Sequence, residues 1–323
     1  MISFPHAIRH SRNGLTALEM LVVLSVVGLL MAILVPAIQH ARETSRRTQC
    51  TTNLRQIASA AHGFEAIHGE FPNHLYHFRD VLPHLDQVPL YEYLKKRKHS
   101  FNKRTGSVPV LICPTDAHAD VARNQTSYRI SVGSTIDPWK FDGMVGPGPE
   151  GVRIQEVHDG LSNTAMYSER LVQPDVRGLT PATFDRFSRR YEIRFLWRPP
   201  LNYDGTILRK LAADCQAPIN RITAAITRTD RDYAFQLHGG EYTHLSGPNT
   251  FSCFKIGTIG MNGGLMAGAN GASSASISST SAHAGGVNTA MADGSVRFIS
   301  DSIHLETWRA LGTRAGGDEL GTF

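Results

Sequence analysis

Near the C-terminus of this 323-residue chain, a histidine, a carboxylate and a hydroxyl lie close together in the sequence, at His283 and in Asp293-Gly294-Ser295. Nucleophilic catalysis or metal binding would use groups of these types. They do not form the G-x-S-x-G turn that exposes a nucleophilic serine in many hydrolases. An Asp-Gly pair between two apolar runs is also typical of a β-hairpin turn. We therefore expect a hairpin here, and a hydrolase is the weakest of three functional hypotheses.

Acidic and amide side chains in glycine-containing turns offer the oxygen ligands that calcium prefers. The candidates are Asp159 and Asn163, in the segment DGLSN, and Asp293 in the later Asp-Gly pair. Their spacing does not match an EF-hand loop, and Asx turns use the same residues without a metal. We therefore expect no cofactor, and calcium is the one ion that these residues could bind.

The chain has 15 histidines, and only His74, His77 and His84 form a loose group. A helix would place His74 and His77 on one face, but Pro83 interrupts a helix before His84. We therefore expect no zinc site at these histidines.

The four cysteines are Cys50, Cys113, Cys215 and Cys253. None belongs to a CxxC pair, so neither a zinc ribbon nor a thioredoxin-like motif is expected. Outside the cytoplasm they could form two disulfides, with three pairings open, and buried thiols are the alternative.

The composition is that of a globular protein with room for one large or two small domains, because 41% of the residues are hydrophobic and 19% are charged. The net charge of +5 is spread along the chain rather than gathered in basic blocks with interleaved aromatic residues. Nucleic acid is therefore not expected as a partner.

An apolar segment lies near the N-terminus, before all of these residues. No charged residue occurs from Met20 to Val35, and Glu19 lies at the start of this run. A helix needs about 20 apolar residues to span a membrane, and a carboxylate inside such a helix is costly in lipid. A cleaved secretory signal would have a shorter apolar core, and a plain signal anchor would not explain Glu19. Arginines flank the run on both sides, so charge alone does not decide the topology.

The stretch GLTALEMLVVLSVVGLLMAILVPAIQHAR resembles the cleavage and methylation segment of type IV prepilins. The resemblance implies that a prepilin peptidase cleaves after Gly14 and that Leu15 becomes the methylated N-terminus. Glu19 and Pro36 match the glutamate and proline of the family, whereas Leu15 stands where phenylalanine is usual. It also implies a leader on the cytoplasmic side, a single pass of the inner membrane, and a body in the periplasm or on the cell surface. Glu19 would then meet the positive N-terminus of a neighbouring pilin-like subunit.

The downstream pattern predicts a helix that continues to about residue 70, with apolar residues such as Leu54 and Ile57 at helical spacing. Short helices are expected over 71–101, a short strand over 108–116, and strands over 126–133 and 165–169. A helix is expected at 207–214, and a Gly/Ala/Ser-rich surface loop at 257–286. The hairpin over 287–299 and a helix over 305–311 complete the body.

Ordered blocks along the body resemble a bacterial prepilin-like family of unknown function, domain of unknown function 1559. The blocks are CTTNLRQI (50–57), FP (71–72), LDQ (85–87), CPTD (113–116), TSY (126–128), DGLSNT (159–164), ER (169–170) and H to DGS (283–295). His158 and the long middle depart from the family pattern. The resemblance covers nearly the whole chain and implies an architecture rather than an activity.

Together these observations predict a pilin-like α+β fold. It consists of a leader (1–14), a transmembrane half-helix (15–36), an amphipathic continuation (37–70) and an extracytoplasmic domain (71–323) that holds an antiparallel sheet. The leading functional hypothesis is a non-enzymatic pseudopilin or minor-pilin-like subunit of a type II secretion or type IV pilus-like system. The alternative is a membrane-tethered module that binds glycan or protein through residues 173–282. In either case we hypothesise Cys50–Cys113 and Cys215–Cys253 disulfides, the first of which would join the helix to the sheet.

Overall fold

The computed structural model describes residues 16–73, 77–96, 108–117, 119, 125–135, 140–146, 150–172, 193–196, 205–216, 223–224, 240–255 and 275–317. The chain divides into two compact units, Met1–Ser45 and Arg46–Phe323. One helix, α1 (Ala17–His68), runs through the boundary between them.

The described part of the first unit belongs to α1. Its large apolar side chains are exposed along the run from Leu18 to Ile38. Pro36 lies inside the helix and does not end it. A helix that is apolar on all sides is typical of a membrane span rather than of the surface of a soluble domain.

In the second unit, α1 contributes one face to the core. The buried positions recur every three or four residues, which places them on one side of the helix, and they are Cys50, Asn53, Leu54, Ile57, Ala58, Ala60 and Ala61. The helix ends at His68, and Gly69 follows with φ +75°, a left-handed conformation that glycine adopts readily. The predicted helical continuation, its apolar face and its end are confirmed.

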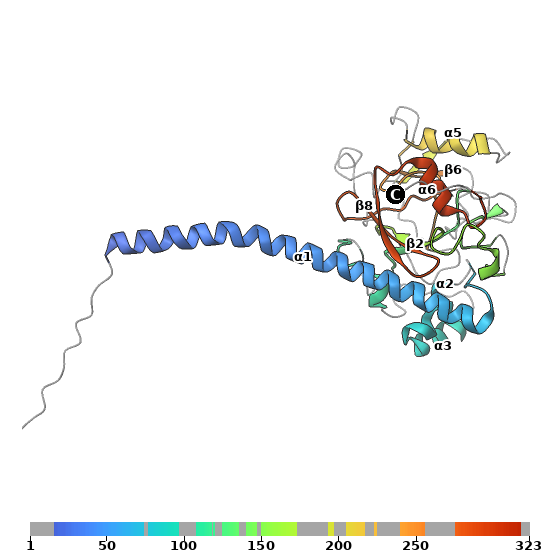
Figure 1. Ribbon diagram of the computed structural model, residues 1–323, viewed down its shortest axis with the longest axis horizontal. Helices are drawn as coiled ribbons and strands as arrows, with labels where there is room; N and C mark the ends of the chain where they lie inside the picture. The colour runs from blue at the N-terminus through green and yellow to red at the C-terminus, as the bar shows by residue number, and fades with distance from the viewer. Residues whose placement is uncertain are drawn as a thin grey trace, which may run out of the picture. The chain divides into compact units, whose positions relative to one another are not determined.

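The body contains a five-stranded sheet in the order β5-β1-β2-β8-β9. Two of its strands, β2 and β8, are labelled in Figure 1. Its strands are β1 (Tyr128–Ser131), β2 (Ala165–Glu169), β5 (Glu241–Tyr242), β8 (Gly286–Met291) and β9 (Val296–Ser300). The β1–β5 pair is parallel and the other pairs are antiparallel, so the sheet is mixed rather than wholly antiparallel. The fold is α+β with a long N-terminal helix packed on this sheet, as predicted.

The predicted C-terminal hairpin is formed by β8 and β9, in which Ala290 pairs with Val296. Gly294 in the connecting turn has φ +83°, which fits the Asp-Gly signal. Helix α6 (Leu305–Gly312) follows the hairpin.

A second, four-stranded sheet has the order β4-β3-β6-β7. Its strands are β3 (Ile193–Leu196), β4 (Thr223–Ala224), β6 (Ser252–Lys255) and β7 (Ala275–Ser276), and α5 (Gly205–Gln216) precedes β4. This sheet belongs to the middle of the chain, where the sequence predicted the helix but not the strands.

The segment before Cys113 does not form the predicted strand. It forms a short 3₁₀ helix, η2 (Pro109–Leu111), with proline at its first turn. Proline fixes its own φ near −65° and has no N–H for a sheet ladder, so it favours this turn over a strand. The short helices predicted over 71–101 are present as α2 (His77–Asp80), η1 (Leu82–Leu85) and α3 (Val88–Lys96).

Two hydrophobic clusters cover opposite faces of strand β8. Ala290 belongs to the larger cluster with Leu54 and Ile57 of α1, whereas Val287 and Met291 belong to a smaller cluster around Trp308 of α6. Because successive residues of a strand point to opposite faces, α1 and α6 pack on the two sides of the sheet.

The prediction of a surface loop over 257–286 is wrong for the described end of that segment. Ser278, Ser279, Thr280 and His283 are buried. Small hydroxyl side chains can fill an interior when they find hydrogen-bond partners, and Ser279 Oγ donates to the carbonyl oxygen of Glu169 at 3.0 Å. Residues 257–274 of the predicted loop lie outside the described residues.

Candidate functional site

Glu19 closes the N-terminus of α1 together with Thr16. The Thr16 N–H donates to Glu19 Oε2 at 2.8 Å, and the Thr16 hydroxyl donates to the same oxygen at 3.0 Å. The Glu19 N–H in turn donates to Thr16 Oγ1 at 3.3 Å. This is a capping box, which satisfies N–H groups that have no partner within the helix. The predicted cleavage residues Gly14 and Leu15 lie outside the described residues.

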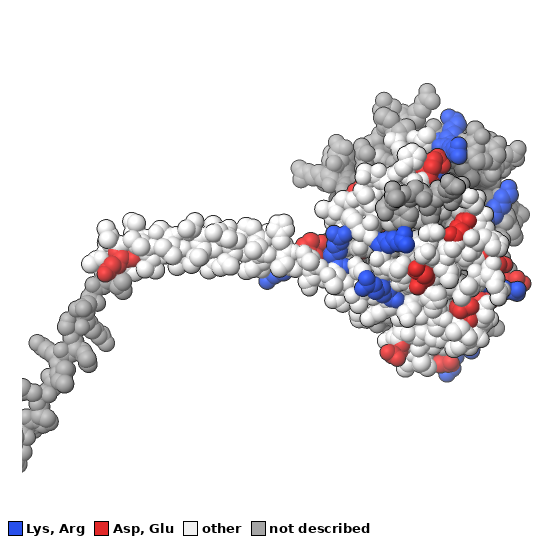
Figure 2. All heavy atoms as spheres, viewed as in Figure 1, with Lys and Arg blue, Asp and Glu red and all other residues white. Residues whose placement is uncertain are grey.

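The apolar half of α1 has the length and composition of a membrane span. Its most apolar 18-residue window has a mean hydropathy of 2.9, and none of that window is buried. Figure 2 shows this stretch as uninterrupted white between charged residues. A signal sequence would meet the same criteria, and single-pass anchoring is consistent with them.

The predicted Cys50–Cys113 disulfide is confirmed. The two residues are 63 positions apart in sequence, and their Cα atoms are 5.0 Å apart. Cys50 comes from the buried face of α1, and Cys113 follows η2. The disulfide therefore joins the helix to the segment that leads into the sheet.

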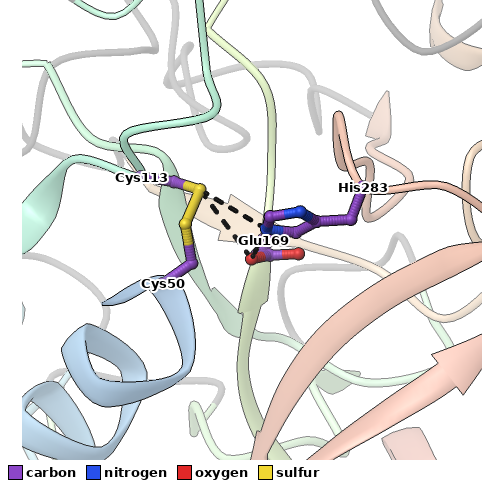
Figure 3. Close-up of side chains that lie close together, drawn as sticks. All are labelled: Cys50, Cys113, Glu169 and His283. Atoms are coloured by element: carbon purple, nitrogen blue, oxygen red, sulfur yellow. Dashed lines mark hydrogen bonds and ion pairs between the residues drawn. A yellow bond between two sulfur atoms is a disulfide. The ribbon is translucent and has the colours of Figure 1, made fainter. Parts of the chain in front are cut away.

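Glu169 and His283 form a buried pair against this disulfide (Figure 3). His283 Nε2 lies 3.5 Å from Glu169 Oε1 and 3.8 Å from Cys113 Sγ. Both side chains are about 2% exposed. A disulfide sulfur has no hydrogen to donate, so the 4.0 Å approach of Cys113 Sγ to Glu169 Oε1 is a packing contact rather than a hydrogen bond.

The surrounding backbone fixes both members of the pair. Asn288 on β8 donates its N–H to Glu169 Oε2 and its side-chain amide to Glu169 Oε1, each at 2.9 Å. The N–H of His283 donates to Ser281 Oγ at 3.1 Å. A buried carboxylate needs such donors, because an unpaired charge in the interior is strongly destabilising.

The structure does not bring His283 together with Asp293. Strand β8 (Gly286–Met291) lies between them, and its six residues span about 20 Å at about 3.3 Å each. Asp293 Oδ1 accepts the N–H of Ser295 at 2.8 Å, which is the role of a turn residue. The partner of His283 is instead Glu169, which the sequence marked only as part of a family block.

The calcium candidates Asp159, Asn163 and Asp293 lie in adjoining turns, because the Asp293 N–H donates to the carbonyl oxygen of Leu161 at 3.0 Å. The Asp159 carboxylate accepts the Thr313 hydroxyl at 3.0 Å and the N–H groups of Gly316 and Gly317 at 2.7 and 2.9 Å. Asn163 donates its amide to the carbonyl oxygen of Asp159 at 3.2 Å. Asp159 therefore holds the segment after α6 in place. Asp116 also accepts two donors, the Ser127 hydroxyl at 2.8 Å and the Val172 N–H at 2.9 Å.

The loose histidine group is divided among different contacts. His77 packs against Phe78, with ring centroids 4.0 Å apart. His84 lies against Gly63 of α1, where an added Cβ would come within 2.7 Å of its ring. His74 lies outside the described residues.

His244 is a buried histidine that the sequence did not single out. Its Nδ1 lies 2.7 Å from the carbonyl oxygen of Trp308, so this nitrogen carries the proton, and Nε2 lies 2.9 Å from the Tyr242 hydroxyl. Burial lowers its pKa from 6.5 to about 3, against the opposing effect of the Trp308 carbonyl. Burial also raises the pKa of Asp142 to about 6, although Ser134 N–H and Arg314 favour its charged form.

Only one cysteine of the second predicted disulfide has a described side chain. Cys215 on α5 is disulfide-bonded. The side chain of Cys253 is not among those that the structure describes, so the Cys215–Cys253 pairing stays a prediction.

Comparison with known proteins gives one match. No curated protein and no solved structure matches the chain significantly. The model of a family described as "Protein of unknown function (DUF1559)" matches residues 39–306, and this match begins only at the last few residues of the prepilin-like segment. This match covers most of the body, including the disulfide and the Glu169–His283 pair, and the chain therefore belongs to the DUF1559 family.

Proposed function

We propose that this protein is a pseudopilin or minor-pilin-like subunit, held in the inner membrane by α1, with its body outside the cytoplasm. The observation that carries the proposal is the change of environment along one helix. Leu21 is 68% exposed and Leu54 is fully buried, although both are apolar residues of α1. The exposed half needs a surrounding that is not water, and lipid or neighbouring helices would supply it.

Continuity of the helix favours an anchor over a removable signal. α1 passes through Pro36 and reaches the core at Cys50, whose disulfide fixes that half of the helix in the body. The half of α1 that would lie in the membrane is thus continuous with the half that contributes to the core. Membership of the DUF1559 family is compatible with a membrane-anchored extracellular module.

The capping box supports a role for Glu19 at the start of the span. Before assembly, Thr16 provides local hydrogen bonds for the carboxylate, which lowers the cost of keeping it near lipid. In an assembly, the positive N-terminus of a neighbouring subunit, Leu15 after cleavage, would attract the same carboxylate. The partners in this proposal are a prepilin peptidase and methylase, other pilin-like subunits and the membrane, and no reaction is assigned to the body.

The test compares Glu19→Val with the wild type and with Ser25→Ala. Ser25 is a suitable control because its hydroxyl donates within the helix, to the Val22 carbonyl at 2.8 Å, and it also lies in the apolar run. All three proteins should fractionate with membranes. In-cell crosslinking should give oligomers for the wild type and for Ser25→Ala, and these should be lost for Glu19→Val.

Oligomers that persist unchanged in Glu19→Val would contradict the assembly role. That outcome would favour the alternative, a membrane-tethered module that binds glycan or protein through residues 173–282. Most of that region lies outside the described residues, so the alternative stays a prediction.

A further inference from the structure

We propose that Cys50, Cys113, Glu169 and His283 form a redox-gated site for a thiolate-binding divalent metal ion such as Zn²⁺. The disulfide closes the site, and reduction of the disulfide opens it. The four side chains come from α1, the segment after η2, the end of β2 and the segment before β8. This site is separate from the apolar half of α1 on which the proposed function rests.

The spacing of the ligand atoms fits a tetrahedral zinc ion. The four atoms all lie within 4.8 Å of one another. His283 Nε2 is 3.8 Å from Cys113 Sγ, Glu169 Oε1 is 4.0 Å from the same sulfur, and the nitrogen and oxygen are 3.5 Å apart. Zinc bonds of about 2.3 Å to sulfur and about 2.0–2.2 Å to nitrogen and oxygen place tetrahedral ligands about 3.3–3.8 Å apart. Small side-chain movements would therefore suffice once the two sulfurs separate.

The ligand set and its surroundings are those of a structural site rather than a surface cluster. Two cysteines, one histidine and one carboxylate are established zinc ligand types. All four residues are buried, so few solvent molecules would compete for the metal. Asn288 already holds the Glu169 carboxylate with two donors at 2.9 Å, as the partners of a ligating carboxylate do.

A disulfide by itself does not require a buried carboxylate and imidazole beside it. Replacing a buried pair with well-packed apolar residues is often neutral or stabilising. The interior here instead retains Glu169 and His283 with the atoms that would ligate a metal directed at Cys113 Sγ (Figure 3). In the reduced protein, the two cysteine thiolates would complete a set of four metal ligands with Glu169 and His283.

Electrons and protons balance in the change from the disulfide form to the metal-binding form. A dithiol reductant supplies two electrons and two protons, the Cys50–Cys113 bond breaks to give two thiols, and the reductant's own sulfurs form a disulfide. Binding of Zn²⁺ then releases the two thiol protons, because thiolates are the ligands. With Glu169 ionised and His283 neutral, the occupied site carries one net negative charge, as a Cys₃His zinc site does.

The test uses the full chain in detergent, oxidised or reduced with a phosphine, followed by added Zn²⁺, removal of excess metal, and measurement of zinc per chain. A Cys215→Ser/Cys253→Ser variant is the background, so that only Cys50 and Cys113 supply thiols. The reduced protein should retain one zinc per chain and the oxidised protein none. Cobalt in place of zinc should give the thiolate charge-transfer band of a tetrahedral site.

His283→Gln and Glu169→Gln in the same background distinguish the site from two thiols that bind metal alone. Each substitution removes a ligand, and the zinc affinity should fall at least tenfold. Asp116→Asn is the matched control, because Asp116 is also a buried carboxylate but is not in the cluster. The proposal is overturned if the reduced protein retains no zinc, or if neither ligand variant weakens binding. If the reduced chain loses its circular dichroism signal, recovery with zinc supports the site and no recovery overturns it.

Discussion

Glu19 and Glu169 are two carboxylates that the same chain places in contrasting surroundings. Glu19 lies at the end of an exposed apolar helix and is capped by Thr16, three positions away. Glu169 lies in the interior and is held by Asn288 and His283, more than a hundred positions away in sequence. The first carboxylate is exposed and accepts hydrogen bonds from a neighbour in the sequence. The second has its hydrogen-bond partners only when the whole body has folded. An exposed group such as Glu19 can meet another molecule, whereas a buried one such as Glu169 contributes first to the stability of the body.

Loss of the Cys50–Cys113 disulfide should have the largest effect on the body. For a separation of 63 residues, the chain-entropy estimate is about 4 kcal/mol of unfolding free energy. We expect Cys50→Ser/Cys113→Ser to lower the urea midpoint of unfolding accordingly. The transition can be measured by tryptophan fluorescence, to which the buried Trp308 contributes. An effect below about 1 kcal/mol would mean that the disulfide does not brace the body.

Glu169→Ala should have the next-largest effect on stability. The substitution removes the carboxylate that lies beside the buried His283 and that accepts hydrogen bonds from Asn288. We expect a loss of roughly 3 kcal/mol in unfolding free energy. Glu19→Ala is the matched comparison and should leave unfolding of the body unchanged, since Glu19 lies outside that unit. Equal effects of the two substitutions would remove the contrast between the two carboxylates.

His244 extends the comparison to a buried group whose ring nitrogens bond to two uncharged groups, the Trp308 carbonyl oxygen and the Tyr242 hydroxyl. Its pKa is lowered from 6.5 to about 3 in the folded protein, so between these pH values the unfolded chain binds more protons. The stabilisation is complete above about pH 6.5 and is lost as the pH falls, by about 1.4 kcal/mol per unit.

The measurement for His244 compares two proteins, the wild type and His244→Gln, by how much unfolding free energy each loses as the pH falls. Between pH 7 and 5, the wild type should lose about 2 kcal/mol more stability than His244→Gln. Asp142, whose raised pKa gives the opposite slope, is present in both proteins and cancels. Parallel pH curves for the two proteins would show that His244 does not titrate as its burial requires.

Thr16→Ala should have the smallest effect, and it should be local. Loss of the cap should cost about 1 kcal/mol at the start of α1. Hydrogen exchange in detergent should speed up for the amides near residues 17–20 and stay unchanged for those near 50–61. Ser25→Ala should leave both groups of amides as in the wild type.

Local signals in the sequence account for much of what was predicted correctly. The apolar spacing of Leu54 and Ile57, the Gly69 stop and the Asp293-Gly294 turn each depend on neighbours in the chain, and each matches the structure. Pro109 was a local signal as well, although the apolar residues around it favoured a strand over the 3₁₀ turn that it forms.

The interior site could not be predicted in the same way. Glu169 and His283 meet because β2 and β8 pair, and that register is set by the packing of the whole sheet. The sequence offered one hint, which is the charged Glu169 at the end of the predicted strand 165–169. The structure shows that this strand is buried along its whole length. The buried serines near Ser279 were missed because composition alone suggests a loop, whereas their hydrogen-bond partners are distant in sequence: Ser279 donates to Glu169 on β2, and Ser278 donates to the Phe251 carbonyl oxygen.

Mass spectrometry of the protein from native membranes can decide whether α1 is a processed membrane anchor of the prepilin type, as we propose. Processing of this type predicts an N-terminal peptide that begins with methylated Leu15, still joined to the residues of the apolar run. A mature protein that retains Met1, or one that begins after the apolar run, would contradict it.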